Sequence, residues 1–206
     1  MSFKDYHIIL ASNSPRRKEL LHGLDIAFDV RVQPDIVETY PESVAPADVA
    51  GYISREKANA YKDTITEHEL IITADTVVIV GNEILGKPAN DDEAKEMLRK
   101  ISGRKHQVVT GVCLTTTKKQ HCFSVSTDVT FKNLTEKEIE YYVETYSPLD
   151  KAGAYGIQEW IGYVGVTALE GSYFNVMGLP VQRIWEELNN FCNVLTTFKQ
   201  KKTTIK

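Results

Sequence analysis

The sequence predicts a mixed α/β fold in which a mixed β-sheet is flanked by helices. Three observations predict it. β-rich runs alternate with helical patterns along the chain, helix-capping signals precede several of the helical patterns, and 42% of the 206 residues are hydrophobic. A chain of this length and composition can bury a substantial core. We therefore expect residues 1–206 to form one domain, with room for two lobes.

The first elements follow from apolar runs and from turn chemistry. Residues 6–11 (YHIILA) form an apolar run typical of a buried strand. The polar turn after it leads to a helix from residue 15 to about residue 23, because Ser14 is a good N-cap and Pro15 suits the first helical position. Apolar residues at helical spacing predict a second helix over residues 47–64.

A long β-rich run, LIITADTVVIV, covers residues 70–80. Gly81-Asn82 then favours a hairpin turn into a short strand at residues 83–85. Periodicity and capping predict the remaining elements, which are helices at 91–102, 135–146 and 180–191, paired strands at 106–117 and 122–131, and an extended, loop-like segment at 154–166.

The charge balance and cysteine usage limit the classes of function. With 24 basic and 28 acidic side chains, the net charge is -4, whereas general nucleic-acid binders usually have a basic excess. A phosphate ligand would therefore need a local cluster of cations. Apolar stretches are too short for a secretory signal or a membrane span. Cys113, Cys122 and Cys192 include no C-x-x-C pair, so we expect reduced thiols in a cytoplasmic protein rather than disulfides or structural zinc.

The turn at residues 12–17 (SNSPRR) is the first candidate site. A strand leads into a helix start there, where free N–H groups and the helix dipole favour an anion. Arg16 and Arg17 add forked donors that match phosphate oxygens. A capped helix with two solvated arginines is the simpler interpretation of the local pattern. Basic residues in a first helical turn oppose the dipole, however, unless an anion binds beside them.

Asp75 and Lys57 are the next candidates. Asp75 interrupts an apolar strand run, and a buried carboxylate is costly unless it is paired or bound to a metal. The alternative is an aspartate that accepts from neighbouring backbone. Lys57 continues the apolar stripe of its helix, so it either extends its ammonium to solvent or reaches a phosphate from the inner side.

Three further candidates are weaker individually. Lys87 projects from the Gly-Lys-Pro turn at residues 86–88, and Glu38 is able to hold a divalent ion together with Asp75. The glycine-containing segment 150–158 (DKAGAYGIQ) contains Lys151 and ends at Gln158, whose amide can donate and accept at a base edge. An ordinary turn-rich loop is the alternative. Common phosphate-loop, dinucleotide, zinc-protease and nucleophile-elbow motifs are absent.

Together these segments resemble the Maf family of nucleotide pyrophosphatases, which are related to septum-formation inhibitors. The resemblance extends over nearly the whole chain in order: LASNSPRRKELL, REKA, ADTVV, LGKP, SGRKHQVVTGV, LDKAGAYGIQ and GSYFNVMGLPV. It implies an elongated mixed sheet with two lobes and a central substrate cleft, similar to that of inosine triphosphatases. It also implies hydrolysis between the α- and β-phosphates of a nucleoside triphosphate, with Mg²⁺ or Mn²⁺.

The resemblance also implies roles for particular residues. Asp75 matches the family's catalytic aspartate and Glu38 its acidic N-terminal motif, and both are expected at the metal. The chain departs from that motif at Val37, where a further acid is common. The substrate-binding residues implied are Ser12, Arg16, Arg17, Lys57, Thr76, Lys87, Lys151 and Gln158.

Arg16, Thr76 and Gln158 also match the branch that acts on dTTP and UTP, rather than the branch with Trp and Gln at the first two positions. We therefore expect a dTTP/UTP pyrophosphatase. A nucleotide-binding regulator of cell division without turnover and a phosphatase that removes only the terminal phosphate are the alternatives. The expected partner is a small-molecule nucleoside triphosphate, without nucleic acid or membrane, and the sequence is compatible with a homodimer.

Overall fold

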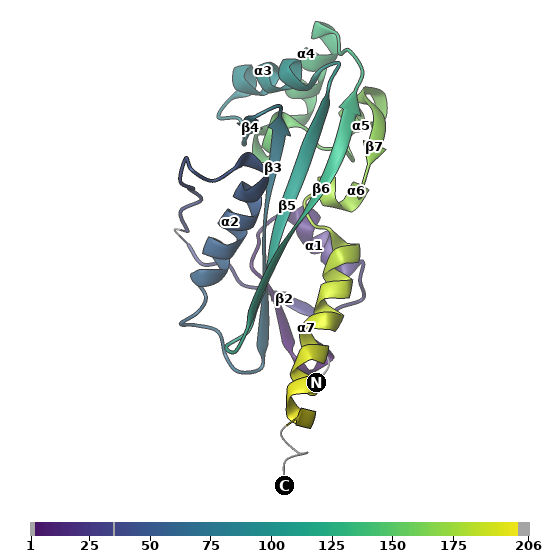
Figure 1. Ribbon diagram of the computed structural model, residues 1–206. Coiled ribbons are helices and arrows are strands. Elements are labelled where there is room, and N and C mark those ends of the chain that lie inside the picture. Colours follow the sequence, from purple (N-terminus) through teal and green to yellow (C-terminus); the bar gives the residue numbers. More distant parts are fainter. Residues whose placement is uncertain (1–2, 35, 202–206) are drawn as a thin grey trace.

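A seven-stranded mixed sheet extends along the molecule in the computed structural model, which describes residues 3–34 and 36–201 (Figure 1). The strand order is β2-β1-β3-β5-β6-β7, and β4 also pairs with β3. β1 is parallel to β2 and β3, whereas all other neighbouring strands are antiparallel. The strands are β1 (His7–Leu10), β2 (Phe28–Val30), β3 (Glu69–Val80), β4 (Glu83–Leu85), β5 (Lys105–Thr115), β6 (Gln120–Phe131) and β7 (Val166–Glu170).

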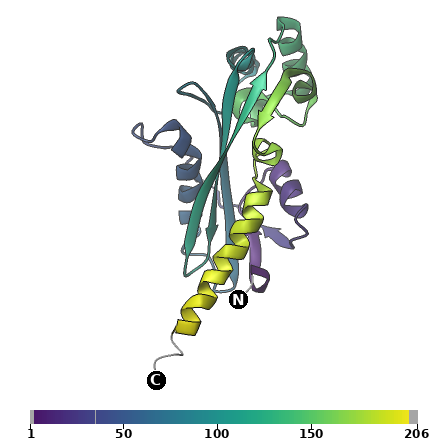
Figure 2. The same ribbon diagram turned by 45° about the vertical axis from the view of Figure 1, so that its right-hand side comes forward.

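Helices cover both faces of this sheet. α2 lies on one face, and α1 and α7 lie on the other, as the turned view makes clear (Figure 2). The α-helices are α1 (Pro15–His22), α2 (Pro46–Asn59), α3 (Asp91–Ile101), α4 (Glu136–Tyr146), α5 (Trp160–Gly165), α6 (Tyr173–Val176) and α7 (Val181–Lys201). Short 3₁₀ turns occur at η1 (Phe3–Asp5), η2 (Pro148–Asp150) and η3 (Ala152–Ala154).

The two largest clusters of the hydrophobic core share the long central strands. One cluster joins β1, β3 and β5 to α1 and α7 and includes Leu10, Ile72 and Ile184. The other joins β3, β5 and β6 to α3, α4 and α5 and includes Leu98 and Tyr142. The sheet and flanking helices confirm the fold class predicted from the sequence.

The alternation of side chains along β3 separates the two faces. Ile72 and Ala74 pack with the α1 and α7 side of the sheet. Val77 packs with α2, and the Thr73 hydroxyl donates to the Ser54 carbonyl of α2 at 2.7 Å. Successive strand residues point to opposite faces, so the sequence neighbours Asp75 and Thr76 cannot share one side of the sheet.

One edge of β3 has an opening in its ladder. β1 pairs with β3 as far as Ile72, and β4 begins to pair with β3 only at Val78. Between them, residues 73–77 pair with β5 alone. The polar turn after β1 and the turn after β4 both lie at this opening, which brings residues from both faces within reach of one ligand.

Two predicted elements need correction. Residues 154–166 were expected to be extended, but residues 160–165 form α5. Its residue Ile161 is buried among the aromatic and aliphatic side chains of the cluster that contains Leu98 and Tyr142. The helix expected at 47–64 ends at Asn59, because Tyr61 turns into the core and its hydroxyl donates to the Arg31 carbonyl at 3.0 Å.

The expectation of reduced thiols is also wrong for two of the three cysteines. Cys113 and Cys122 form a disulfide, with their Cα atoms 4.1 Å apart. They are directly opposite each other in the β5–β6 ladder. The register of that hairpin brings them together, and a separation of nine residues without a C-x-x-C pattern gave no indication of it. The side chain of Cys192 lies outside the described residues.

Candidate active site

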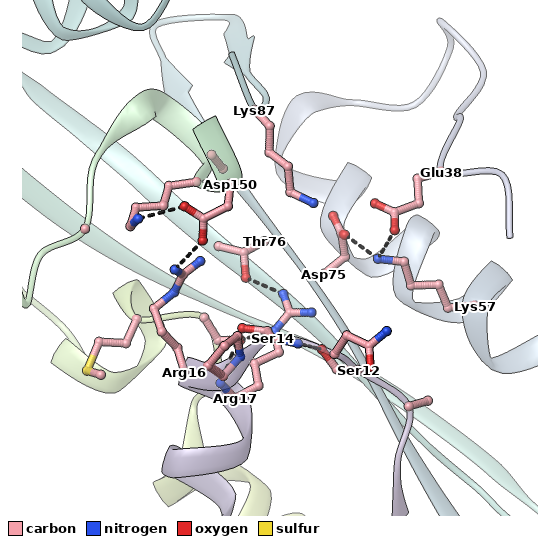
Figure 3. Close-up of a pocket in the computed structure, with 18 of the residues that line it drawn as sticks. Ser12, Ser14, Arg16, Arg17, Glu38, Lys57, Asp75, Thr76, Lys87 and Asp150 are labelled. Atoms are coloured by element: carbon pink, nitrogen blue, oxygen red, sulfur yellow. Dashed lines mark hydrogen bonds and ion pairs between the residues drawn. The ribbon is translucent and has the colours of Figure 1, made fainter. Parts of the chain in front are cut away.

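A cleft of ≈ 470 Å³ lies at the opening in β3, a volume in the range of small-molecule sites. Figure 3 shows side chains converging on it from both faces of the sheet. Every site residue expected from the sequence lines this cleft: Ser12, Arg16, Arg17, Glu38, Lys57, Asp75, Thr76, Lys87, Lys151 and Gln158. The structure therefore brings together residues that are up to 146 positions apart, from Ser12 to Gln158.

The turn at residues 12–17 forms the floor of the cleft. Ser14 caps α1 by accepting from the backbone N–H of Arg17 at 3.4 Å, and Pro15 occupies the first turn of the helix. The hydroxyl of the buried Ser12 accepts from the backbone N–H of Ser14 at 3.2 Å. The first turn of α1 contains no acidic residue. The N–H groups of Ser14 and Arg17 are bonded and Pro15 has none, so the positive end of the helix dipole, with no acid in the first turn, is what favours an anion here.

Arg17 is held by protein acceptors to a greater extent than the sequence suggested. Its guanidinium donates to the carbonyl of Ala74 at 2.7 Å, the carbonyl of Gly178 at 2.8 Å and the hydroxyl of Thr76 at 3.1 Å. The carbonyl of Ile72 accepts from the backbone N–H of Ala11, which directly follows β1. The carbonyl of Ala74, two residues further along β3, is the next acceptor on the same edge. Arg17 thus takes the place of a missing strand at the open edge of β3. Burial lowers its pKa, and two of its five N–H donors remain for a ligand.

Two carboxylates meet one lysine on the α2 face. Lys57 Nζ lies 2.8 Å from Asp75 Oδ1 and 2.9 Å from Glu38 Oε1 (Figure 3). Burial alone would raise the pKa of Glu38, but the hydrogen bond and charge of Lys57 bring that pKa below its usual value. The alternative that Lys57 extends its ammonium to solvent is therefore wrong, since its side chain is only 12% exposed.

Lys87 extends into the cleft from the turn after β4, towards the space between Asp75 and Asp150 (Figure 3). Among the residues that the structure describes, none forms a hydrogen bond or ion pair with its ammonium. Its charge helps to lower the pKa of Glu38. Lys87 is therefore the cation of the cleft that is most available to an anionic ligand.

On the opposite face, Asp150 connects two of the expected binding residues. Its carboxylate lies 2.8 Å from Arg16 Nη1 and 2.7 Å from Lys151 Nζ. Lys151 also lies 3.1 Å from Glu159 Oε1, and its side chain is only 9% exposed. These two cations are the reason that the pKa of Asp150 is lowered despite its partial burial, which acts in the opposite direction. Arg16 and Lys151 are thus fixed in place before any ligand binds.

On the same face as Asp150, a further wall of the cleft is less charged. It is formed by Tyr155, Gln158 and the segment 176–178. Gln158 Oε1 is buried and has no hydrogen-bond partner among the described residues. Buried polar atoms are seldom left without a partner, so an orphaned amide oxygen beside a cleft indicates a ligand position. Behind this wall, Tyr155 bonds to the buried His106 ring at 2.8 Å.

Sequence reasoning did not single out three residues that shape the site. Asp150 was seen only as part of a motif, and Gly178 and Thr110 were not considered. Gly178 has φ +110°, and a Cβ there would lie 3.6 Å from both Arg17 Nε and Thr76 Oγ1. Thr110 is a hydroxyl within an apolar strand run, which is the same kind of signal that identified Asp75.

The described residues include no group of three or more His, Cys, Asp or Glu side chains arranged to hold a metal ion. Their helices also include none that is long and apolar enough to span a membrane. Any metal in this cleft would therefore rely on the Glu38 and Asp75 carboxylates together with ligand and water oxygens.

Comparisons with known proteins show which family the chain is similar to. The model of the family described as "Maf-like protein" matches residues 7–191. The "dTTP/UTP pyrophosphatase" of Phocaeicola vulgatus is 57% identical over 91% of this chain and 97% of its own. That of Bacteroides thetaiotaomicron is 56% identical over 89% and 95%. Among solved structures, the Staphylococcus aureus Ham1 protein is 15% identical, with a TM-score of 0.42 over 77% of this chain and 90% of its own.

Proposed function

The chain belongs to the Maf family, and we propose that it hydrolyses dTTP and UTP to the nucleoside monophosphate and pyrophosphate. One observation supports this most strongly: a carboxylate pair and a cluster of cations face each other across an opening in the sheet. Five cationic side chains line the cleft against three carboxylates, although the whole chain has a net charge of -4. Curated relatives that are 57% and 56% identical over 91% and 89% of the chain have this activity as their name.

The two faces of the sheet suggest how the nucleotide is oriented. Asp75, Glu38 and Lys57 lie on the α2 face, where two carboxylates converge on one lysine. Thr76 and Gln158 lie on the other side, beside the less charged wall. We assign the reacting phosphates to the first region and the base to the second. The triphosphate then passes the floor at residues 12–17 and the ammonium of Lys87, which neutralise its charge.

Asp75 is the proposed general base. Its Oδ1 accepts from Lys57, and none of the described residues donates to Oδ2. Oδ2 is thus available to orient a water molecule and to take its proton as the water attacks a phosphate. Lys57 keeps the carboxylate in a fixed orientation, and preorganised cations such as Lys87 stabilise the charge that develops on the phosphate oxygens. No covalent intermediate is needed.

Glu38 and Asp75 fit the requirements of a Mg²⁺ or Mn²⁺ cofactor. Mg²⁺ in phosphate sites is usually held by one or two carboxylates, substrate phosphates and water, and this chain offers two carboxylates that converge on one point. A bound divalent cation would supply charge neutralisation at the phosphate oxygens.

Arg16, Thr76 and Gln158 are proposed to select the base. Uracil and thymine present two carbonyl acceptors on either side of an N3–H donor, and cytosine has an amino group in place of one carbonyl. Gln158 is able to donate and accept at such an edge. A site that hydrogen-bonds one edge rejects another by leaving buried polar groups without partners. We therefore expect dTTP and UTP to be used well ahead of CTP, ATP and GTP.

A panel of five triphosphates tests the proposal. Each nucleotide is incubated with the protein and Mg²⁺, and pyrophosphate and orthophosphate are measured separately. Pyrophosphate and the monophosphate should appear together from dTTP and UTP. Orthophosphate as the first product would contradict the proposed reaction. Binding without turnover would instead support a regulator, although Asp75 argues against that function because a carboxylate weakens the binding of a polyanion.

We further propose that residues 1–206 act as one domain in the cytoplasm. The long strands β3, β5 and β6 run through both lobes, and the cleft contains residues from both. Most cytoplasmic thiols are reduced, whereas Cys113 and Cys122 form a disulfide in this structure. Thiol titration of the protein after extraction under denaturing, alkylating conditions distinguishes the two states.

A further inference from the structure

Behind Thr76, a row of buried polar groups crosses from β3 to α6. Thr76 and Thr110 are directly opposite each other on β3 and β5. Their hydroxyl oxygens are 2.9 Å apart, and Thr110 Oγ1 lies 3.0 Å from the backbone carbonyl of Asn175. Arg17 Nη2 donates to Thr76 from the other side at 3.1 Å. Thr110 and Asn175 are completely buried, whereas Thr76 lines the cleft.

The position of the Asn175 carbonyl is firmly determined. The side-chain amide of Asn175 donates to the carbonyl of Val108 on β5 and to the hydroxyl of Thr127 on β6, both at 3.0 Å. A carbonyl can only accept, so the contact with Val108 also establishes which end of the amide carries the nitrogen. These bonds hold α6 against the sheet, with its Asn175 backbone carbonyl directed at Thr110.

The direction of each hydrogen bond follows from this carbonyl. Because the Asn175 carbonyl can only accept, Thr110 donates its single hydroxyl proton to it. Thr110 can then only accept from Thr76, and this contact uses the Thr76 proton. Arg17 has donors alone, which agrees with a Thr76 oxygen that accepts. The reverse direction would leave the Thr110 and Asn175 oxygens 3.0 Å apart with no proton between them.

Thr76 therefore presents only a lone pair to the cleft. A free threonine hydroxyl can rotate and either donate or accept, so it does not distinguish a donor from an acceptor on a base. With its proton held by Thr110, Thr76 bonds favourably to an N–H group and meets an acceptor with repulsion. The N3 position is a donor in uracil and thymine and an acceptor in cytosine.

We propose that Thr110 is a positioning residue for base selection, because it holds the Thr76 proton and thereby makes Thr76 accept from N3–H of uracil or thymine and reject cytosine. The inference rests on the proposed function for the identity of the ligand. It adds a residue that touches no substrate and acts only through the hydroxyl of Thr76.

Thr110→Val tests the proposal because valine keeps the shape of threonine and lacks the hydroxyl. Thr110→Ser is the matched control, since serine keeps the hydroxyl. The ratio of kcat/KM for UTP to that for CTP should fall about 10- to 100-fold in Thr110→Val, the scale of one hydrogen bond. It should stay near the wild-type ratio in Thr110→Ser. A purely structural role would lower both efficiencies equally, and an unchanged ratio in Thr110→Val overturns the proposal.

Folding of the variant is not expected to fail, because the Asn175 carbonyl also accepts from the backbone N–H of Gly178 at 3.0 Å. If Thr110→Val does not fold, Thr110→Ala is measured in the same way. Wild-type protein provides an independent check with 3′-deoxy-UTP, which lacks the 3′-hydroxyl, the sugar donor that UTP and dTTP share. The kcat/KM for this analogue should stay close to that for UTP. A loss of tenfold or more in kcat/KM would indicate that Thr76 contacts the sugar and would overturn the assignment.

Binding of α,β-methylene analogues of UTP and CTP, measured by calorimetry with Mg²⁺, separates this proposal from the proposed function. These analogues cannot be cleaved, so the preference for UTP over CTP is obtained without turnover. Wild-type protein that prefers the UTP analogue but releases no pyrophosphate from UTP would contradict the reaction and leave the base selection standing. If wild type and Thr110→Val prefer the UTP analogue over the CTP analogue to the same extent, and turnover is intact, the result would contradict the base selection alone.

Discussion

Gly111→Ala should damage catalysis although Gly111 does not line the cleft. Gly111 is directly opposite Asp75 in the β3–β5 ladder. A Cβ at this position would lie 2.3 Å from the carbonyl oxygen of Ala50 in α2, whereas ordinary contacts begin at 3.4 Å. The backbone of α2 cannot rotate away as a side chain would, so the helix must retreat by about 1 Å.

That retreat would move the ammonium of Lys57, because Lys57 is on α2. The ammonium lies 2.8 Å from Asp75 Oδ1, and an additional 1 Å would break the hydrogen bond that orients the carboxylate. A displacement of this size in a catalytic group costs about 10²-fold in rate. Overpacking should also destabilise the protein by about 1–3 kcal/mol, and each kcal/mol lowers Tm by about 2–4 °C in a chain of this size.

Gly51→Ala is the matched control. Gly51 lies on α2 beside Gly111, but its added Cβ would meet only the hydroxyl of Ser124, which can rotate. Alanine also favours the helix by about 1 kcal/mol relative to glycine. Steady-state pyrophosphate release and thermal unfolding are measured for both variants. A folded Gly111→Ala protein with kcat/KM within about threefold of wild type would refute the argument that α2 positions Lys57.

Three further perturbations test other parts of the site. Asp75→Asn should lower kcat by about 10²–10⁴-fold while triphosphate binding persists, and near-normal turnover of the folded variant would remove Asp75 from its role. Lys87→Ala should reduce kcat/KM about tenfold or more through a lost charge-assisted bond, whereas wild-type efficiency would mean that Lys87 does not touch phosphate. Burial lowers the pKa of His106 to about 4 in the folded protein. As the pH falls from 6.5 towards 4, the imidazole therefore binds a proton in the unfolded chain before it does so in the folded one, and the free energy of unfolding decreases. The free energy of unfolding of wild type should drop over that interval by about 3 kcal/mol more than that of His106→Gln, and equal pH dependence of the two proteins would show that His106 is not the group responsible.

Local signals were sufficient for most of the fold. Ser14 and Pro15 indicated the start of α1, and the structure places the cap and the first turn there. Thr135 with Glu138 indicated a capping box, and both of its hydrogen bonds form. Such signals depend on a few neighbouring residues, so they can be read from the sequence. By contrast, β2 and β7 are short strands of three and five residues that were not predicted, because pairing with distant strands stabilises them.

The composition of the cleft was predictable, but its partnerships were not. Local patterns suggested Asp75, Arg16, Arg17 and Lys57 and, more weakly, Glu38, Lys87, Lys151 and Gln158, and the resemblance added the roles of Ser12 and Thr76. Neither source indicates that Arg17 donates to Ala74 and Gly178, or that Asp150 joins Arg16 to Lys151. Those contacts depend on the opening in the ladder of β3, which exists because five residues of that strand lie between its pairing with β1 and its pairing with β4. Strand lengths of this kind are set by tertiary pairing.

The register of β3 explains how one dipeptide serves both ends of a nucleotide. Asp75 and Thr76 point to opposite faces, and the opening in the sheet lets one ligand reach both. A slip of one residue between β3 and β5 would exchange the faces and place the threonine hydroxyl beside Lys57. Nine consecutive pairs, from Ile71 to Ile79, hold β3 against β5, and the apolar residues on both faces oppose any such slip. The long strand β3 therefore also keeps the proposed catalytic carboxylate on the face proposed for the metal and the proposed selecting hydroxyl on the face proposed for the base.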